Sequence, residues 1–177
     1  MITTNTTITN STSEWIGTVR IEHTALTAQA HTIAAAAHAG VRRTAGDVYL
    51  DHPLRCAARL QRAGHGEQVI AAAILHDVLE DSALAASDLL ALGIPALVVQ
   101  AVLSVSKAPG EVYTDLVARA AADSIGRLVK VSDILDNSSV VQLAPLPVEK
   151  RERVAAKYAG ALATLQAVVD IPALSAA

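Results

Sequence analysis

"AAAILHDVLEDS", residues 71–82, brings an apolar run directly up against four ionisable residues within six positions. The apolar run predicts a buried helix over residues 67–79. Residues four apart lie one turn apart on the same face of a helix, so we expect His76 over Glu80 and Asp77 over Asp81. Unpaired carboxylates in an apolar setting are costly, so this polar corner needs a partner group, water or a cation. A metal ion is the simplest of these solutions.

Two residues from other segments could complete a metal site. His52 stands at the head of an earlier predicted helix, in "YLDHPLRCAARL", and Asp133 is a lone acid in the apolar segment "RLVKVSDILDN". Taken singly, His52 could be an ordinary helix N-terminal residue and Asp133 a satisfied core acid. Together with His76 and Asp77 they offer two imidazoles and two carboxylates from three helices, a donor set suited to Mn²⁺, Zn²⁺ or Fe.

The composition predicts an all-α fold, a compact single-domain bundle of about eight helices. Ala, Leu and Val dominate a chain of 177 residues that has no Phe, and the formal net charge is −3. That charge gives no general affinity for nucleic acid or anionic membranes. The longest uncharged apolar stretch, residues 91–105, is shorter than the roughly 20 residues that a membrane span needs. A single cysteine, Cys56, cannot form an internal disulfide and fits a cytoplasmic protein.

The chain is expected to consist of one folded domain with two loose ends. Residues 1–13 are rich in Thr, Asn and Ser and predict a disordered tail, residues 14–170 the domain, and residues 171–177 a frayed C-terminus. No strand pattern is apparent. The expected helices cover residues 15–39, 51–63, 67–79, 82 or 87 to 92, 95–105, 115–122, 124–143 and 148–169.

Three segments of the sequence resemble those of a known family, the HD metal-dependent phosphohydrolases. Residues 37–60, "AHAGVRRTAGDVYLDHPLRCAARL", resemble the pattern "AHxGQxRxxGxPYxxHPxxVAxxL", "AAILHDVLEDS" resembles "AALLHDVxEDT", and "VKVSDILDN" resembles "IKLADRLHN". These are motifs of the hydrolase domain of RelA/SpoT proteins and of the stand-alone small alarmone hydrolases. The resemblance covers residues 25 to 165, nearly all of the expected domain.

The resemblance implies a role for each matching residue. The metal ligands of the family match His52, His76, Asp77 and Asp133, with one Mn²⁺ as the usual ion and Zn²⁺ or Fe as the other candidates. The acidic pair that handles the attacking water matches Glu80 and Asp81. The matches around the substrate are Arg43 against the guanine base, Asn137 near the ribose, and Tyr49, Ser104 and Lys107 around the pocket.

The implied reaction removes the 3′-pyrophosphate from guanosine tetra- or pentaphosphate, giving GDP or GTP and pyrophosphate. The implied partner is therefore a small nucleotide. A metal can lower the pKa of a bound water and polarise a phosphoryl oxygen, and a nearby carboxylate can take the proton of that water. Nothing in the sequence indicates an oligomeric state.

The substrate motif departs from the family pattern after Asp133. Ile134 stands where the family has Arg, Asp136 where it has His, and Ser138 and Ser139 occupy the region of a further Arg. The pocket therefore loses positive charge and gains a carboxylate, and Arg42, Lys107, Arg127 or Lys130 would have to compensate. Two alternatives stay open: a hydrolase of another nucleotide, such as an adenosine alarmone, NADPH or a nucleoside phosphate, or a weakly active nucleotide-binding regulator.

Other notable residues are interpreted structurally. His38 either shapes the pocket or fills the core, and Cys56 is expected to be a buried inert thiol. The charged stretch at residues 149–157 predicts an exposed helix face.

Overall fold

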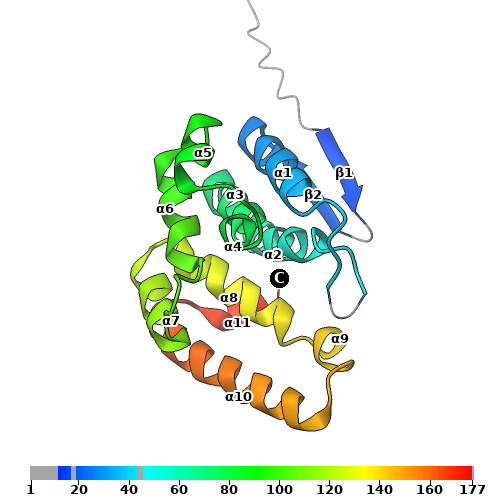
Figure 1. Ribbon diagram of the computed structural model, residues 1–177, viewed down its shortest axis with the longest axis vertical. Coiled ribbons are helices and arrows are strands. Elements are labelled where there is room, and N and C mark those ends of the chain that lie inside the picture. Colours follow the sequence, from blue (N-terminus) through cyan, green and yellow to red (C-terminus); the bar gives the residue numbers. More distant parts are fainter. Residues whose placement is uncertain (1–11, 17–18, 44–45, 177) are drawn as a thin grey trace, which may run out of the picture.

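The Ala- and Leu-rich segments of the chain form helices, as the composition predicts. The computed structural model describes residues 12–16, 19–43 and 46–176. These residues contain eleven helices and one antiparallel sheet of two strands (Figure 1). The all-α class is confirmed for the body of the molecule, to which the strand pair is an addition. No helix in the described ranges combines the length and apolar character needed to cross a bilayer.

The elements follow one another with short connections. The strands are β1 (Thr12–Ile16) and β2 (Val19–His23). The helices are α1 (Ala25–Ala37), α2 (Asp51–Arg62), α3 (Glu67–Leu75), α4 (Val78–Asp81), α5 (Ala86–Ala91), α6 (Ala96–Val105), α7 (Tyr113–Ala122), α8 (Gly126–Asn137), α9 (Val140–Leu143), α10 (Val148–Leu165) and α11 (Ile171–Ala176).

The N-terminal region differs from its prediction. The helix expected from residue 15 begins only at Ala25, where a capping box fixes its start: Thr27 N–H donates to the Thr24 hydroxyl (3.3 Å), and Thr24 N–H donates to the Thr27 hydroxyl (2.8 Å). The preceding residues pair as strands, Ile16 opposite Val19. Alternation of apolar and polar residues over 19–22 is typical of a strand, and the Ala-rich segment that follows hid this signal.

Both expected loose ends also need revision. Residues 1–11 of the predicted tail lie outside the described residues, but Thr12 and Ser13 belong to β1. At the C-terminus, residues 171–176 form α11 instead of fraying, and Leu174 is only 2% exposed. An apolar side chain thus anchors this last helix, which packs against α8.

The helix expected over residues 67–79 is interrupted at the two residues that matter most. Helix α3 ends at Leu75, a turn holds His76 and Asp77, and α4 starts at Val78. The prediction that all four ionisable groups share one continuous helix was therefore wrong. Likewise, the helix expected over residues 124–143 divides into α8 and α9.

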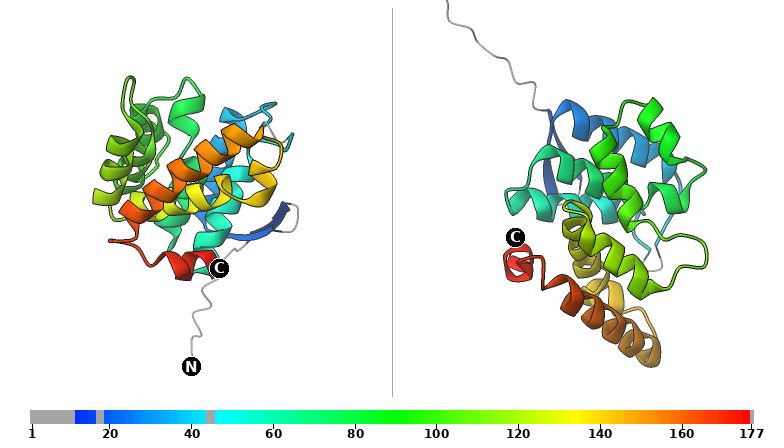
Figure 2. Two further views of the ribbon diagram at one scale, coloured as in Figure 1. Left: turned by 90° about the horizontal axis from the view of Figure 1, so that it is seen from below. Right: turned by 90° about the vertical axis from the view of Figure 1, so that its left-hand side faces the viewer.

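Helix α3 is the centre of the molecule. Its residues from 70 to 75 are buried, and it packs against α1, α2, α6 and α8. Helix α10 packs along α7 and α8, at the end of the molecule furthest from the strand pair (Figures 1 and 2). The turn after α3 therefore emerges from the core close to α2 and α8.

Candidate metal centre and adjoining cavity

The four predicted metal ligands come together from three places in the chain. His52 lies in the first turn of α2, His76 and Asp77 lie in the turn between α3 and α4, and Asp133 lies on α8. His52 Nε2 is 3.3 Å from an Asp133 oxygen and 3.7 Å from an Asp77 oxygen. His76 Nε2 is 3.3 Å from Asp77 and 3.9 Å from Asp133. One ligand atom each from His52, His76 and Asp77 lie within 4.8 Å of one another.

Both imidazoles are held with Nε2 directed at this cluster. His76 Nδ1 lies 2.8 Å from the Ala73 carbonyl, which can only accept, so Nδ1 carries the proton. His76 Nε2 is buried and has no hydrogen-bond partner within the described part of the chain. His52 Nδ1 lies 2.7 Å from Asp136 Oδ2, which leaves its Nε2 for the cluster in the same way. An unsatisfied buried nitrogen is costly, and a divalent cation bound by two imidazoles and two carboxylates removes that cost.

Asp133 is held in its ionised form. Burial alone would raise the pKa of this carboxyl, but the charge of Lys130 and the hydrogen bond with His52 hold that pKa well below its ordinary value. Lys130 Nζ lies 2.8 Å from Asp133 Oδ2, and the Asn137 amide donates to Asp133 Oδ1. Lys130, predicted as a compensating cation for substrate, is therefore already paired with a metal ligand.

Tyr49 lines the cavity next to Asp77, and His38 packs against the Tyr49 ring. The Tyr49 hydroxyl donates to Asp77 Oδ2 at 3.0 Å, and the Tyr49 ring stacks on His38 with centroids 4.7 Å apart. Burial lowers the pKa of His38, so the ring stays neutral although Asp77 and Asp81 act in the opposite direction. His38 is only 2% exposed and does not line the cavity, so of its two interpretations the core position is the one observed.

Glu80 and Asp81 occupy different places at the end of α4. Glu80 lines a cavity beside the cluster, and its Oε1 accepts the backbone N–H of Lys107 at 2.8 Å. Partial burial raises the pKa of Glu80 above its ordinary value. Asp81 is exposed and does not line the cavity. Burial and the charge of Asp77 are the main causes that raise the pKa of Tyr49, and Asp81 adds to the rise.

Arg43 and Asn137, both predicted to contact substrate, contact each other. An Arg43 Nη2–H donates to the Asn137 side-chain oxygen, and Nη1 lies 3.2 Å from Asp136 Oδ2. Arg43 lies between α1 and α2. The guanidinium is thus fixed at the edge of the site by two residues of α8.

The cavity has a volume of about 230 Å³ and carries charges of both signs. Its acidic side is formed by Asp77, Glu80 and Asp133, and its basic side by lysines from three elements. The lining residues are Tyr49, Asp77, Glu80, Lys107, Tyr113, Leu116, Lys130, Asp133, Asn137, Lys157 and Tyr158.

Lys157 and its two tyrosine neighbours were missed from the sequence. Lys157 is exposed, as predicted for the charged stretch at residues 149–157, but it also lines the cavity, and its Nζ lies 3.8 Å from the centroid of the Tyr113 ring. Within the described ranges, no carboxylate forms an ion pair with it. Tyr113 and Tyr158 are two of three tyrosines in a chain without Phe, and their scarcity is the signal that could have drawn attention to them.

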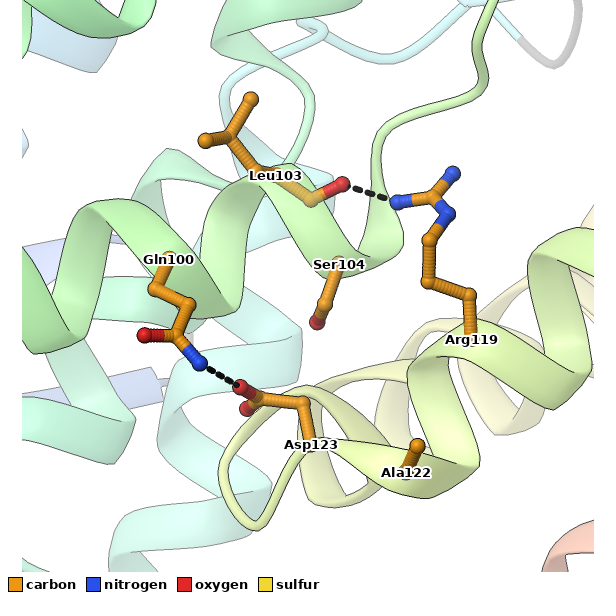
Figure 3. A pocket seen from close by; sticks show the side chains of 6 residues that line it. All are labelled: Gln100, Leu103, Ser104, Arg119, Ala122 and Asp123. Carbon is orange, nitrogen blue, oxygen red and sulfur yellow. Dashed lines mark hydrogen bonds between the residues drawn. The ribbon is translucent and has the colours of Figure 1, made fainter.

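Ser104 lies elsewhere. It lines a different hollow, of about 330 Å³, between α6 and α7, together with Gln100, Leu103, Arg119, Ala122 and Asp123 (Figure 3). Its hydroxyl donates to the Ala101 carbonyl at 2.7 Å. A Cβ added at Gly126 would lie 2.0 Å from that hydroxyl oxygen, so Ser104 packs closely against the start of α8. The structure gives Ser104 a packing role and does not bring it to the cavity.

Two buried imidazoles and two carboxylates on a helical scaffold form a donor set suited to a divalent metal ion. A family model described as the HD domain matches residues 30–141, and the chain belongs to this HD domain family. The match includes all four residues of the candidate metal centre and ends before Lys157.

The named relatives include a pyrophosphohydrolase and a probable pyrophosphokinase. A guanosine-3′,5′-bis(diphosphate) 3′-pyrophosphohydrolase of Aquifex aeolicus is 32% identical over 134 residues, which are 72% of this chain and 19% of that protein. A Mycobacterium leprae protein named as a probable GTP pyrophosphokinase is 31% identical over 147 residues, 77% of this chain and 18% of that protein. The chain therefore spans about a fifth of the length of these two curated relatives.

A solved structure shares the fold. It is described as a metazoan ortholog of SpoT that hydrolyzes ppGpp, and it superposes with a TM-score of 0.74 at 24% sequence identity. The superposition covers 86% of this chain and 91% of the other.

Proposed function

We propose that this protein is a metal-dependent phosphohydrolase that removes the 3′-pyrophosphate from guanosine tetra- or pentaphosphate. The observation that carries the proposal is the pair of buried imidazole Nε2 atoms facing two carboxylates, beside a cavity lined by Glu80 and three lysines. Membership of the HD domain family and the names of the relatives support the same reaction. A nucleotide substrate and a lone buried thiol, Cys56, fit a location in the cytoplasm.

The proposed cofactor is a single Mn²⁺ ion, held by His52, His76, Asp77 and Asp133. When bound, such an ion lowers the pKa of a water and offsets the charge on phosphate. The same donor set suits Zn²⁺ and Fe. Tyr49, Asn137 and Lys130 each hydrogen-bond to one of the two ligating aspartates, so they fix the direction of the carboxylate oxygens.

Glu80 is the proposed general base. Its pKa is raised above the ordinary value, which makes the carboxylate a stronger base, and its hydrogen bond from the Lys107 N–H holds the carboxylate at the cavity wall. The water loses a proton to Glu80 and forms a bond to the phosphorus next to the ribose 3′-oxygen. The bond between that phosphorus and the 3′-oxygen breaks, and the 3′-oxygen takes up a proton, giving GDP and pyrophosphate. Asp81 takes no proton in this step; its negative charge helps to keep the Tyr49 hydroxyl protonated.

The basic side of the cavity is the proposed seat of the pyrophosphate group. Lys130 is neutralised by Asp133, which leaves Lys107 and Lys157 to compensate for the basic residues that the motif lacks. Arg42 is directed elsewhere, because its Nη1–H donates to the Gly46 carbonyl at 2.9 Å.

Replacing Lys157 by Gln is expected to raise KM for the guanosine tetraphosphate about tenfold, the loss of one hydrogen bond to a charged group. We expect kcat to change less, because Lys157 contacts neither the metal cluster nor Glu80. Steady-state kinetics with Mn²⁺ measure both constants.

The matched control is Lys150→Gln, which removes the same charge two turns earlier on α10 from an exposed position that does not line the cavity. KM should stay within about twofold of wild type. Equal KM values for the two variants would show that Lys157 does not bind the substrate.

The proposed function is tested by supplying the metal-free protein with Mn²⁺ and the guanosine tetraphosphate. We expect release of GDP and pyrophosphate in equal amounts, and loss of both when a chelator is added. If neither Mn²⁺, Zn²⁺ nor Fe²⁺ supports the release of pyrophosphate, the proposal is wrong.

One observation favours a second candidate, an HD phosphohydrolase of another nucleotide. Arg43, the expected contact for the guanine base, is engaged by Asp136 and Asn137, and Ile134 adds no charge. A nucleotide whose base is recognised elsewhere in the cavity would then be the substrate. A comparison of kcat/KM across a panel of phosphate esters separates this candidate from the first.

A further inference from the structure

Asp136 is the least expected polar residue of the site, because it adds a carboxylate to a pocket for phosphate. It lies in the last turn of α8, three residues after Asp133, and its residue surface is only 3% exposed. Its Oδ2 is 2.7 Å from His52 Nδ1, on the side of the ring opposite the metal cluster. Asp136 therefore contacts the ligand His52 without facing the cluster itself.

Two arginines hold this carboxylate in place. Arg55 binds it in a bidentate manner, with Nε–Oδ1 at 2.8 Å and Nη2–Oδ2 at 3.0 Å. Arg43 Nη1 adds a third contact to Oδ2 at 3.2 Å. Bidentate guanidinium–carboxylate pairs fix both distance and direction, so the carboxylate has one orientation.

A carboxylate surrounded in this way can only accept hydrogen bonds. Its two oxygens accept three hydrogen bonds from the Arg43 and Arg55 guanidiniums, which are always charged, so the carboxylate is paired as an anion. Since an ionised carboxylate has no proton to donate, the shared proton belongs to His52 Nδ1. His52 Nε2 then carries the free lone pair of the ring. This nitrogen lies 3.3 Å from an Asp133 oxygen.

We propose that Asp136 is a positioning residue that holds His52 in the Nδ1–H form and so aims Nε2 at the metal ion. This rests on the proposed metal-dependent function, but not on the identity of the nucleotide. A carboxylate behind a ligating imidazole fixes the ring and raises its basicity, and loss of such a partner weakens metal binding by about 10- to 100-fold.

The same carboxylate also ties the segment before α2 to α8. Arg55 Nη2 lies 3.2 Å from Asp47 as well as 3.0 Å from Asp136. Arg43 joins the same pair of acids, 4.0 Å from Asp47 and 3.2 Å from Asp136. Asp47 thus shares both arginines with Asp136 but makes no contact with His52, which makes it a matched control.

The test compares Asp136→Asn with Asp47→Asn. Calorimetric titration of the metal-free proteins with Mn²⁺ should show an affinity about 10- to 100-fold weaker for Asp136→Asn and within about threefold of wild type for Asp47→Asn. Asp136→Glu keeps the charge and is expected to recover at least part of the lost affinity. Thermal unfolding of each metal-free variant identifies any that fail to fold.

A spectroscopic measurement reports on the ring itself. In the Zn²⁺-loaded wild type, ¹⁵N-edited NMR should show a strongly downfield Nδ1 proton for His52, and Asp136→Asn should move it upfield. Equal metal affinities for folded Asp136→Asn and wild type, with an unchanged Nδ1 proton, would overturn the proposal. Because these readouts need no nucleotide, failure to hydrolyse the guanosine tetraphosphate would contradict the proposed substrate and leave the role of Asp136 standing.

Discussion

Replacing His76 by Ala is expected to lower turnover of the guanosine tetraphosphate by about 10³-fold or more. The variant loses one of two imidazole ligands, and with it the bound cation whose charge stabilisation is worth several kcal/mol in the transition state. Among the residues that the structure describes, His76 Nε2 has no hydrogen-bond partner, so this atom is available to a metal ion. Initial rates at saturating Mn²⁺, with parallel calorimetric titration of the metal, measure both effects.

The control for His76→Ala is His65→Ala, which removes an imidazole from the turn before α3. Its rate and metal affinity should match those of wild type. If folded His76→Ala keeps the wild-type affinity for Mn²⁺, the assignment of the metal centre is wrong.

Replacing Glu80 by Gln is expected to lower kcat by about 10²- to 10⁴-fold, the usual contribution of a general base. Gln can still accept the Lys107 N–H through its side-chain oxygen, so the cavity wall keeps its shape. KM and Mn²⁺ affinity should therefore change little. Steady-state kinetics and metal titration distinguish this result from a loss of metal.

The pH dependence gives a second signature of Glu80. Partial burial raises the pKa of this carboxyl, and the base works only when it is deprotonated. The rate of the wild type should therefore rise with pH through a pKa above the ordinary value for Glu, and Glu80→Gln should lose this rise. Glu67→Gln, at the exposed start of α3, is expected to keep the wild-type profile. An unchanged acid limb in Glu80→Gln would assign the base to another group.

The grouping of the four predicted ligands could be anticipated because it depends on residue types. Few combinations of imidazoles and carboxylates in apolar segments have an inexpensive structural explanation, and His52, His76, Asp77 and Asp133 do lie together. The backbone at the site was not predictable in the same way. The turn at His76 and Asp77 interrupts a segment whose apolar pattern continues through Val78 and Leu79, so periodicity alone could not reveal it.

The substrate side of the site depends on contacts between distant segments. In the sequence, Asp136 was an unfavourable charge for a phosphate pocket. In the structure it lies on the side of the His52 ring away from the metal cluster, where Arg43 and Arg55 neutralise it. From the sequence, Lys157 was one more lysine on an exposed helix face. The packing of α10 against α7 places its Nζ over the Tyr113 ring. Ser104 matched a motif position, but α6 carries it into the contact with Gly126. Tertiary packing decides all three.

The most direct test of the central claim compares kcat/KM of the Mn²⁺-loaded protein across a panel of phosphate esters. The panel contains guanosine 3′,5′-bis(diphosphate), its adenosine counterpart, NADPH, GTP and ATP, with products identified by anion-exchange chromatography. We predict the highest kcat/KM for the guanosine compound, with GDP and pyrophosphate as its products. A higher kcat/KM for any other member, or release of single phosphate from the guanosine compound, would contradict the account.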